Sequence, residues 1–332
     1  MRIGKVLFML LFICSVPITY GYSQAETPDS VQNQLPDNLR SGKALMLIDP
    51  LPDPDDSRLR GEWMPIAEKA QPFMKRAGID VVAAYHKDDI LSGTETEKAF
   101  LRTFDERNIT HLVIIKRESS GYRVTVTEFD KTSLIATDKP VWTASAPDLS
   151  TVLNQLYRTC ANSGQELKNL LILENAVPGI LISPINGRRS EFYDLNLQGD
   201  QLAVLPFADT AEIRQIMKFY PYKYDFVDPE DNEREIRSEG FQFILHYVHT
   251  TGESVRELLG YETGQEEYVS TSVKNGEAFE VTYDKDLPVY KFYIKHIYSG
   301  NVFLGRSYDA APTWQEALTF YIANLRKELM GN

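Results

Sequence analysis

The chain runs twice through the same order of short apolar segments and amphipathic segments, and this repetition constrains its fold most. In each half, strand, helix, strand, helix and three further strands lead into a long closing helix. Ala146-Pro147-Asp148 precedes the first closing helix, and Ala311-Pro312-Thr313 precedes the second. Asp148 and Thr313 are both good N-caps, because their side-chain oxygens accept hydrogen bonds from the first helical amides. The pattern predicts an α/β fold of two similar mixed-sheet domains, each of β-α-β-α-β-β-β-α order, produced by internal duplication.

The period of the apolar positions predicts where each element lies. In the first half we expect strands over 44–48, 80–84, 111–116, 122–129 and 141–145, and helices over 62–77, 95–107 and from 149. In the second half we expect strands over 202–207, 222–227, 241–249, 289–297 and 302–308, and helices over 211–219, 233–238 and from 314. The domains are therefore placed at 44–172 and 202–332, with a linker at 173–201 and an insertion at 250–288. Within the insertion, 268–273 and 278–283 are expected to pair as a hairpin.

The first 25 residues have the pattern of an export signal. Arg2 and Lys5 precede the uncharged apolar run 6–16, and the segment Ser23-Gln24-Ala25 that follows offers small residues at Ser23 and Ala25. The run is too short to span a bilayer, which takes about 20 residues. A lipobox needs a small residue before its cysteine, but Ile13 precedes Cys14. We predict an exported protein of the periplasm or cell envelope that is not lipidated, with a signal peptide at 1–25 and a flexible polar leader at 26–43.

Charge and cysteine content exclude several classes of protein. Lys and Arg number 35 against 47 Asp and Glu, and this net charge of −12 argues against binding nucleic acids or anionic membrane surfaces. Two cysteines cannot form a disulfide framework or a cysteine-based zinc site. Cys160 falls on a helical apolar stripe with Leu153, Leu156, Leu167 and Leu171, which predicts a buried thiol. No P-loop, dinucleotide fingerprint, nucleophile elbow or H-E-x-x-H motif occurs, and we expect no cofactor.

The segment 202–209 (LAVLPFAD) provides one resemblance to a known family. It resembles the first strand of TolB N-terminal-like domains, in which a VLPF strand opens an exported α/β domain. The match covers eight residues, and the corresponding first-half segment departs from it because Asp49 stands at an apolar position. The resemblance implies a non-catalytic envelope module that binds other proteins.

Two groups of possible metal ligands have another interpretation. His246 and His249 would share one side of a helix, but in the expected strand they point to opposite faces of the sheet. The acidic run at 49–56 lacks the glycine turn and distal glutamate of an EF-hand loop, so a solvated loop is expected. We therefore predict no metal site.

An enzyme remains the alternative, because ligands of open α/β sheets bind beyond the carboxyl ends of parallel strands. Asp49, His86 and Asp88 fall at such ends in the first half, and Asp209 and Asp228 do so in the second. A carboxylate cluster with a histidine could activate water, with or without a bound metal ion. The alternative function is thus a hydrolase with Asp49, His86 and Asp88 as its catalytic group.

Aromatic residues alternate along the strand that follows the first helix of the second half. Tyr220, Tyr222 and Tyr224 would form a row on one face, either packed in the core or available to a partner. A sugar-binding platform would use the same residues. We predict a non-catalytic protein-binding module whose partners are envelope proteins. The expected partner surface consists of Phe207, Asp209, Tyr220, Tyr222, Tyr224 and Asp228.

Overall fold

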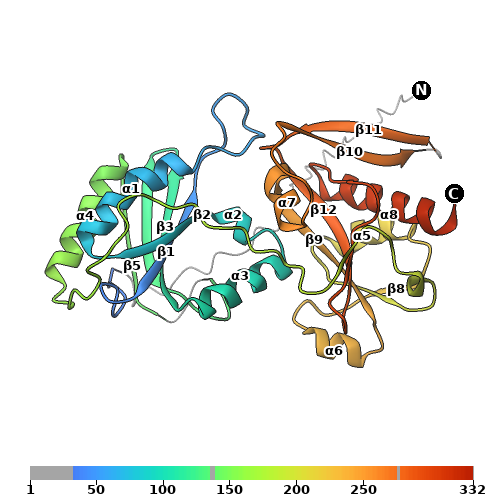
Figure 1. Cartoon of the computed structure of the whole chain (residues 1–332), viewed down its shortest axis with the longest axis horizontal. Helices are drawn as coiled ribbons and strands as arrows, with labels where there is room; N and C mark the ends of the chain where they lie inside the picture. The colour runs from blue at the N-terminus through green and yellow to red at the C-terminus, as the bar shows by residue number, and fades with distance from the viewer. Residues whose placement is uncertain (1–32, 135–138, 275–276, 332) are drawn as a thin grey trace, which may run out of the picture.

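The structure, a computed structural model, describes residues 33–134, 139–274 and 277–331 (Figure 1). The predicted signal peptide at 1–25 and the first part of the predicted leader lie outside these ranges. Within the described chain, no helix combines the length and apolar character that crossing a membrane requires.

The first half forms a five-stranded sheet in the order β2-β1-β3-β4-β5. Strand β1, which lies between β2 and β3, runs parallel to both, whereas β4 and β5 are antiparallel to their neighbours. The elements are β1 (Lys43–Asp49), α1 (Met64–Ala77), β2 (Asp80–His86), α2 (Lys87–Ile90), α3 (Thr94–Glu106), β3 (Ile109–Glu118), β4 (Gly121–Glu128), β5 (Val141–Ala146) and α4 (Leu149–Asn162).

The second half forms a six-stranded sheet in the order β6-β13-β12-β9-β7-β8. Strand β7 lies between β8 and β9 and runs parallel to both. Strand β12 is antiparallel to β9, and β13 is antiparallel to β12. The elements are β6 (Arg189–Ser190), the 3-10 helix η2 (Leu195–Gln198), β7 (Leu202–Val204), α5 (Thr210–Met217), β8 (Tyr224–Phe226), α6 (Glu233–Ser238), β9 (Phe243–Thr251), α7 (Gly252–Leu258), β10 (Glu267–Lys274), β11 (Glu277–Asp284), β12 (Pro288–His296), β13 (Val302–Phe303) and α8 (Trp314–Met330).

The α/β class predicted from the sequence is confirmed. Leaving β6 aside, the order and relative direction of strands in the second sheet repeat those of the first. The predicted N-caps are also present: Asp148 accepts from the backbone N–H of Thr151 at 2.9 Å, and Thr313 accepts from that of Glu316 at 3.3 Å. That a duplication of the gene produced this likeness stays a prediction.

Strand β1 shows why the first sheet is covered on both sides. Ala44, Met46 and Ile48 face α1 and α4, while Leu45 and Leu47 face the opposite way. A parallel strand that is buried on both faces has a continuous apolar sequence, as this one does. The second face packs against Phe100 and Phe104 of α3 and also against residues of the second half.

Helix α3 lies between the two sheets, so the halves share one core (Figure 1). Val248 of β9, Val289 and Tyr293 of β12, and Leu258 of α7 belong to the same buried cluster as Tyr85 of β2. Backbone contact is close at this junction. Gly93 lies so near β9 that a Cβ atom there would be 2.3 Å from the carbonyl oxygen of Tyr247.

The insertion of the second half contains the expected hairpin, which β10 and β11 form. It packs on α8: Phe279 meets Phe320 edge to face, with ring centroids 5.4 Å apart, and the Asn324 side chain donates to the Thr271 carbonyl at 2.9 Å. The hairpin thus covers the helix that closes the second half (Figure 1).

Several expected segments differ from the structure. The strand expected over 202–207 ends at Val204, and the strand expected over 222–227 covers only Tyr224–Phe226. The strand expected over 302–308 ends at Phe303, and Gly305 follows in the left-handed region at φ +78°. Helix α4 ends at Asn162, so Leu167 and Leu171 are exposed rather than part of its apolar stripe, although Cys160 is fully buried as predicted. Residues 33–42 of the expected flexible leader are packed, since Leu35 and Leu39 enter the first core.

Candidate functional site

The carboxyl ends of β1 and β2 bring together the three residues of the predicted catalytic group. Asp49 ends β1 and forms an ion pair with Lys87, with 3.2 Å between Nζ of Lys87 and Oδ2 of Asp49. His86 ends β2 and caps α2, because its Nδ1 atom accepts from the backbone N–H of Asp88 at 3.1 Å. Burial lowers the pKa of His86 to about 4, and the charge of Arg60 acts in the same direction. The imidazole is therefore neutral near pH 7, with one ring nitrogen already engaged.

Asp89, beside this group, binds across the junction between the halves. Its Oδ1 atom lies 2.7 Å from Nη1 of Arg60 and accepts from the hydroxyl of Thr250 at 2.7 Å. The backbone N–H of Arg60 in turn donates to the carbonyl of Asp286 at 3.0 Å. Burial raises the pKa of Asp88, and the negative charge of Asp49 adds to the effect. Asp49 and Asp89 are thus paired with cations at this edge, and Asp89 also links the halves through Thr250.

In the second half, the two predicted strand-end carboxylates stabilise local backbone. Asp209 is the N-cap of α5 and accepts from the N–H groups of Ala211 and Glu212 at 2.9 and 3.1 Å. Asp228 accepts from the N–H of Glu230 at 2.9 Å in the turn after β8. Both side chains are exposed to solvent. Their positions at the sheet edge agree with the sequence, and their present contacts are those of capping residues.

The predicted aromatic row is present around β8, but its members differ in exposure. Tyr220 is buried and meets Tyr222 and Tyr224 edge to face, with ring centroids 5.8 and 6.3 Å apart. Tyr224 meets Phe226 in the same geometry at 6.3 Å. Tyr222, Tyr224 and Phe226 are half-buried, so each keeps part of its ring accessible.

Phe207 belongs to the core of the second half more than to its surface. Its ring centroid lies 5.3 to 5.4 Å from those of Tyr247, Phe292 and Trp314. It is half-buried among these three rings. Of the predicted partner surface, Tyr222 and Tyr224 are therefore the aromatic residues best placed to contact another molecule.

Sequence reasoning missed an ionic cluster between the halves. The ammonium of Lys295 on β12 binds both Glu95, in the first turn of α3, and Glu233, in the first turn of α6; the latter contact is 2.5 Å. His246 on β9 lies beside them, and potential ligand atoms of Glu95, Glu233 and His246 fall within 4.8 Å of one another. Lys295 already supplies the cation for these carboxylates, so the cluster acts as a link between the halves.

The electrostatics of this cluster follow from burial and proximity. Burial acts to raise the pKa of Glu95, but positive charge on His246, when protonated, and on Lys295 outweighs it and lowers the pKa to about 2. Burial lowers the pKa of His246 to about 4, against the attraction of Glu95. Glu95 and Lys295 are 200 residues apart, so no local spacing could have indicated their contact.

His246 and His249 point to opposite faces of β9, as the strand pattern predicted. His246 faces the cluster with Glu95, whereas the ring of His249 stacks on Tyr290, with centroids 3.8 Å apart and planes inclined by 8°. The two imidazoles share no candidate ligand group among the described residues.

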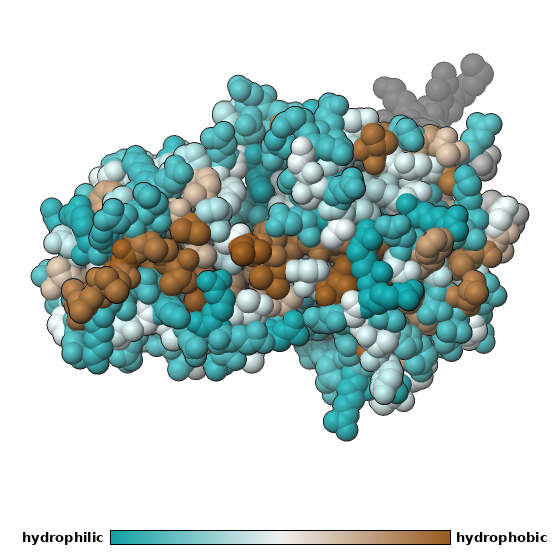
Figure 2. All heavy atoms as spheres, viewed as in Figure 1, coloured by the Kyte–Doolittle hydropathy of each residue, from teal (hydrophilic) through white to brown (hydrophobic). Residues whose placement is uncertain are grey.

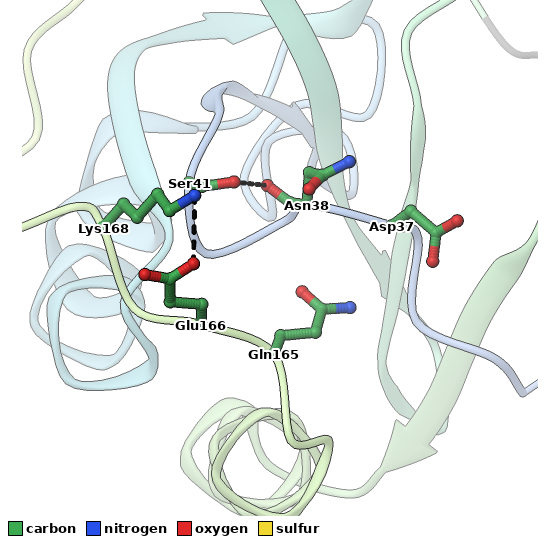
Figure 3. A pocket seen from close by; sticks show the side chains of 6 residues that line it. All are labelled: Asp37, Asn38, Ser41, Gln165, Glu166 and Lys168. Atoms are coloured by element: carbon green, nitrogen blue, oxygen red, sulfur yellow. Dashed lines mark hydrogen bonds and ion pairs between the residues drawn. The ribbon is translucent and has the colours of Figure 1, made fainter.

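Two hollows of the described surface are lined by none of these residues. One, of about 320 Å³, is lined by Asp37, Asn38, Ser41, Gln165, Glu166 and Lys168 (Figure 3). Its polar groups bind one another, since Lys168 pairs with Glu166 at 3.0 Å and the Ser41 hydroxyl donates to the Asn38 carbonyl at 3.1 Å. It is shallow and polar, unlike the largely apolar pockets that bury small ligands.

Comparison with known proteins gives no match: no protein-family model, no curated protein and no solved structure is similar to the chain.

Proposed function

We propose that this protein is an exported, non-catalytic module of the cell envelope that binds another protein through the aromatic surface around β8. We call Phe219, Tyr222, Tyr224 and Phe226 the β8 aromatic surface. The observation that carries the proposal is the position of these rings. Strand β8 is the last strand of its sheet, and its aromatic side chains are half-buried. Phe219, just before the strand, is 54% exposed.

Rings of this kind suit a protein interface for a physical reason. A half-buried tyrosine is already held by its neighbours, so it loses little rotamer freedom when a partner covers the remainder. Here Tyr222 is held by Tyr220, and the guanidinium of Arg214 lies 4.8 Å from the ring centre of Phe226. Aromatic and arginine side chains are enriched at the energetically important centres of interfaces.

The contacts of the strand-end carboxylates support binding rather than catalysis. Asp49 and Asp89 are paired with Lys87 and Arg60, and Asp209 and Asp228 bind backbone amides. A hydrolase at Asp49, His86 and Asp88 is the alternative. Asp88→Asn tests it, since that enzyme would lose its activity and keep its fold.

Export is the part of the proposal that rests on the sequence alone. The short apolar run and the small residues at 23–25 favour cleavage near Glu26 or Tyr22. Intact-mass analysis of the protein from its native host measures the new N-terminus. Retention of Met1, or a lipid adduct on Cys14, would refute this proposal.

To test the partner surface, the parent protein and two matched variants are each used to capture proteins from an envelope extract, and the captured proteins are compared. Tyr222→Ala should weaken capture of the partner by about 1–3 kcal/mol if this tyrosine is a hot spot. Tyr157→Ala is the control, because Tyr157 is likewise a half-buried tyrosine but lies in the first half, where the guanidinium of Arg76 is 4.6 Å from its ring centre.

Thermal melts of the same variants separate binding from folding. A protein that the parent and Tyr157→Ala capture, and that folded Tyr222→Ala does not, supports the proposal. If Tyr222→Ala loses capture only in proportion to its loss of folded protein, the ring is a core residue and the proposed surface is wrong.

A further inference from the structure

The segment that joins the halves displays aliphatic side chains to solvent. After α4 ends at Asn162, the chain crosses the surface without a helix as far as η2. Leu171 is 96% exposed, Leu170 is 79% exposed and Ile180 is 78% exposed. We call the exposed aliphatic residues of this segment the apolar stripe: Leu167, Leu170, Leu171, Leu173, Val177 and Ile180. Figure 2 shows brown side chains in a band across the middle of this face, where the segment runs in Figure 1.

Backbone hydrogen bonds hold the segment in place at both ends of the stripe. Near its start, the N–H groups of Lys168 and Asn169 donate to the carbonyl of Arg40 at 3.0 and 3.1 Å. Near its end, the Ala84 N–H donates to Val177 at 2.8 Å, and the Gly179 N–H donates to Ala84 at 2.7 Å. The leucines between these points are therefore presented on a fixed backbone and are not folded back into the core.

The area of the stripe suits an interface of modest size. Burying an aliphatic side chain gains about 2–3 kcal/mol, and dividing this by about 25 cal/mol per Å² gives the area of one such side chain. Weighted by their exposed fractions, the six side chains of the stripe together expose roughly 400 Å² of apolar surface. Patches of about 300–600 Å² on single proteins are often functional. Two such stripes facing each other would bury about 800 Å² of apolar surface, so the flanking charged side chains must supply the rest of the roughly 1,000–1,200 Å² that a specific interface needs.

The charges along the stripe are complementary to themselves. Lys168 and Glu174 each lie three residues from Leu171, and their side chains are 61% and 81% exposed. A twofold axis beside Leu171 would place Lys168 of one copy opposite Glu174 of the other, twice. In the single chain these residues pair with Glu166 and Lys75, so the contact would extend two existing ion pairs.

We propose that the apolar stripe is the interface of a symmetric dimer, in which a second copy of this chain packs antiparallel with Leu171 at the twofold axis. The stripe lies on the connecting segment, whereas the β8 aromatic surface belongs to the second half, so the proposal does not depend on the proposed function. Its modest area predicts association in the micromolar range.

Sedimentation velocity of the purified protein over the micromolar range tests the dimer. The parent should shift from monomer to dimer as its concentration rises. Leu171→Asp places two carboxylates at the axis and should raise the dissociation constant about 100-fold or more. Leu195→Asp is the matched control, because Leu195 is 70% exposed on η2 outside the stripe, and its dimer should persist.

Charge reversal and cross-linking test the symmetry. Lys168→Glu should weaken the dimer about fivefold, and adding Glu174→Lys should restore it. Leu171→Cys should form a disulfide between two copies under mild oxidation, identified by mass spectrometry, whereas Leu195→Cys should not. A parent that stays monomeric, or a dimer that survives Leu171→Asp, would overturn the proposal. So would a monomer that binds lipid vesicles through the stripe.

Discussion

Replacing Lys295 by methionine is the sharpest test of the ionic cluster that joins the two halves. The substitution keeps the length and apolar stem of the side chain and removes the ammonium that binds Glu95 and Glu233. The Glu95 side chain is 6% exposed, so its carboxylate cannot regain water in place of the lost cation. Removing one partner of a buried ion pair typically costs 3–5 kcal/mol.

Two features of the cluster place the expected loss at the lower end of that range. The Glu233 side chain is 31% exposed and keeps part of its hydration. Lys98 also lies 3.1 Å from Glu95, but its side chain is 59% exposed, and such pairs contribute up to about 1 kcal/mol. We therefore expect Lys295→Met to lower the free energy of unfolding by about 3 kcal/mol.

Urea denaturation at pH 7 measures this loss, and Lys285→Met is the matched control. Lys285 pairs with Glu266 at 2.7 Å, but the Glu266 side chain is 86% exposed, so its loss should be below about 1 kcal/mol. The double variant Glu95→Gln with Lys295→Met should be less destabilised than the sum of the single variants, since no unpaired carboxylate remains at position 95. A loss below about 0.5 kcal/mol for Lys295→Met would refute the reasoning.

Three further predictions concern stability. Burial lowers the pKa values of His86, His246 and His249 to about 4, whereas the pKa of histidine in the unfolded chain is near 6.5. The folded protein should therefore lose stability as the pH falls from 6.5 toward 4, by about 2 kcal/mol per histidine at pH 5. Urea denaturation at pH 7 and pH 5 measures this loss, and equal stabilities would contradict the prediction. Cys160 is fully buried, and burial raises its pKa to about 11, so a thiol reagent should label it slowly until denaturant is added. Cys160→Ser should lower the free energy of unfolding by roughly 1–3 kcal/mol. Rapid labelling of the native protein would instead show a surface thiol. Gly93→Ala should lower the melting temperature more than Gly240→Ala, because a Cβ at Gly93 would overlap the backbone of β9, whereas a Cβ at Gly240 has no atom within 4 Å. Equal melting temperatures would show that the backbone at the junction shifts to accommodate the added methyl group.

Local periodicity was sufficient to predict most of the fold. Strand β1 has apolar residues throughout because both of its faces are covered, and Asp148 and Thr313 stand where the closing helices begin. Each of these signals lies within a few neighbouring residues, so it can be read from the sequence without knowing the tertiary structure. The strand expected over 302–308 was too long, because Gly305 turns the chain after two residues of β13.

The roles of the charged residues were decided by tertiary structure. Asp49, His86 and Asp88 lie at one sheet edge, and the sequence itself places Lys87 beside His86. Only the folded chain brings Lys87 to Asp49 and Arg60 to Asp89. The sequence of β12 gives no sign that Lys295 is buried, since its partners come from α3 and α6.

The exposure of Leu171 was also decided by tertiary structure. The helical spacing of the leucines continues past Cys160, but the backbone of Gly164 turns to φ +70° and helix α4 has already ended. The sequence alone determined most of the long strands and helices, because a periodic apolar face depends on near neighbours, whereas the short elements α2, α7, β6 and η2 were not expected. The pairing of charges and the exposure of the apolar stripe depend on distant segments that meet only in the folded protein.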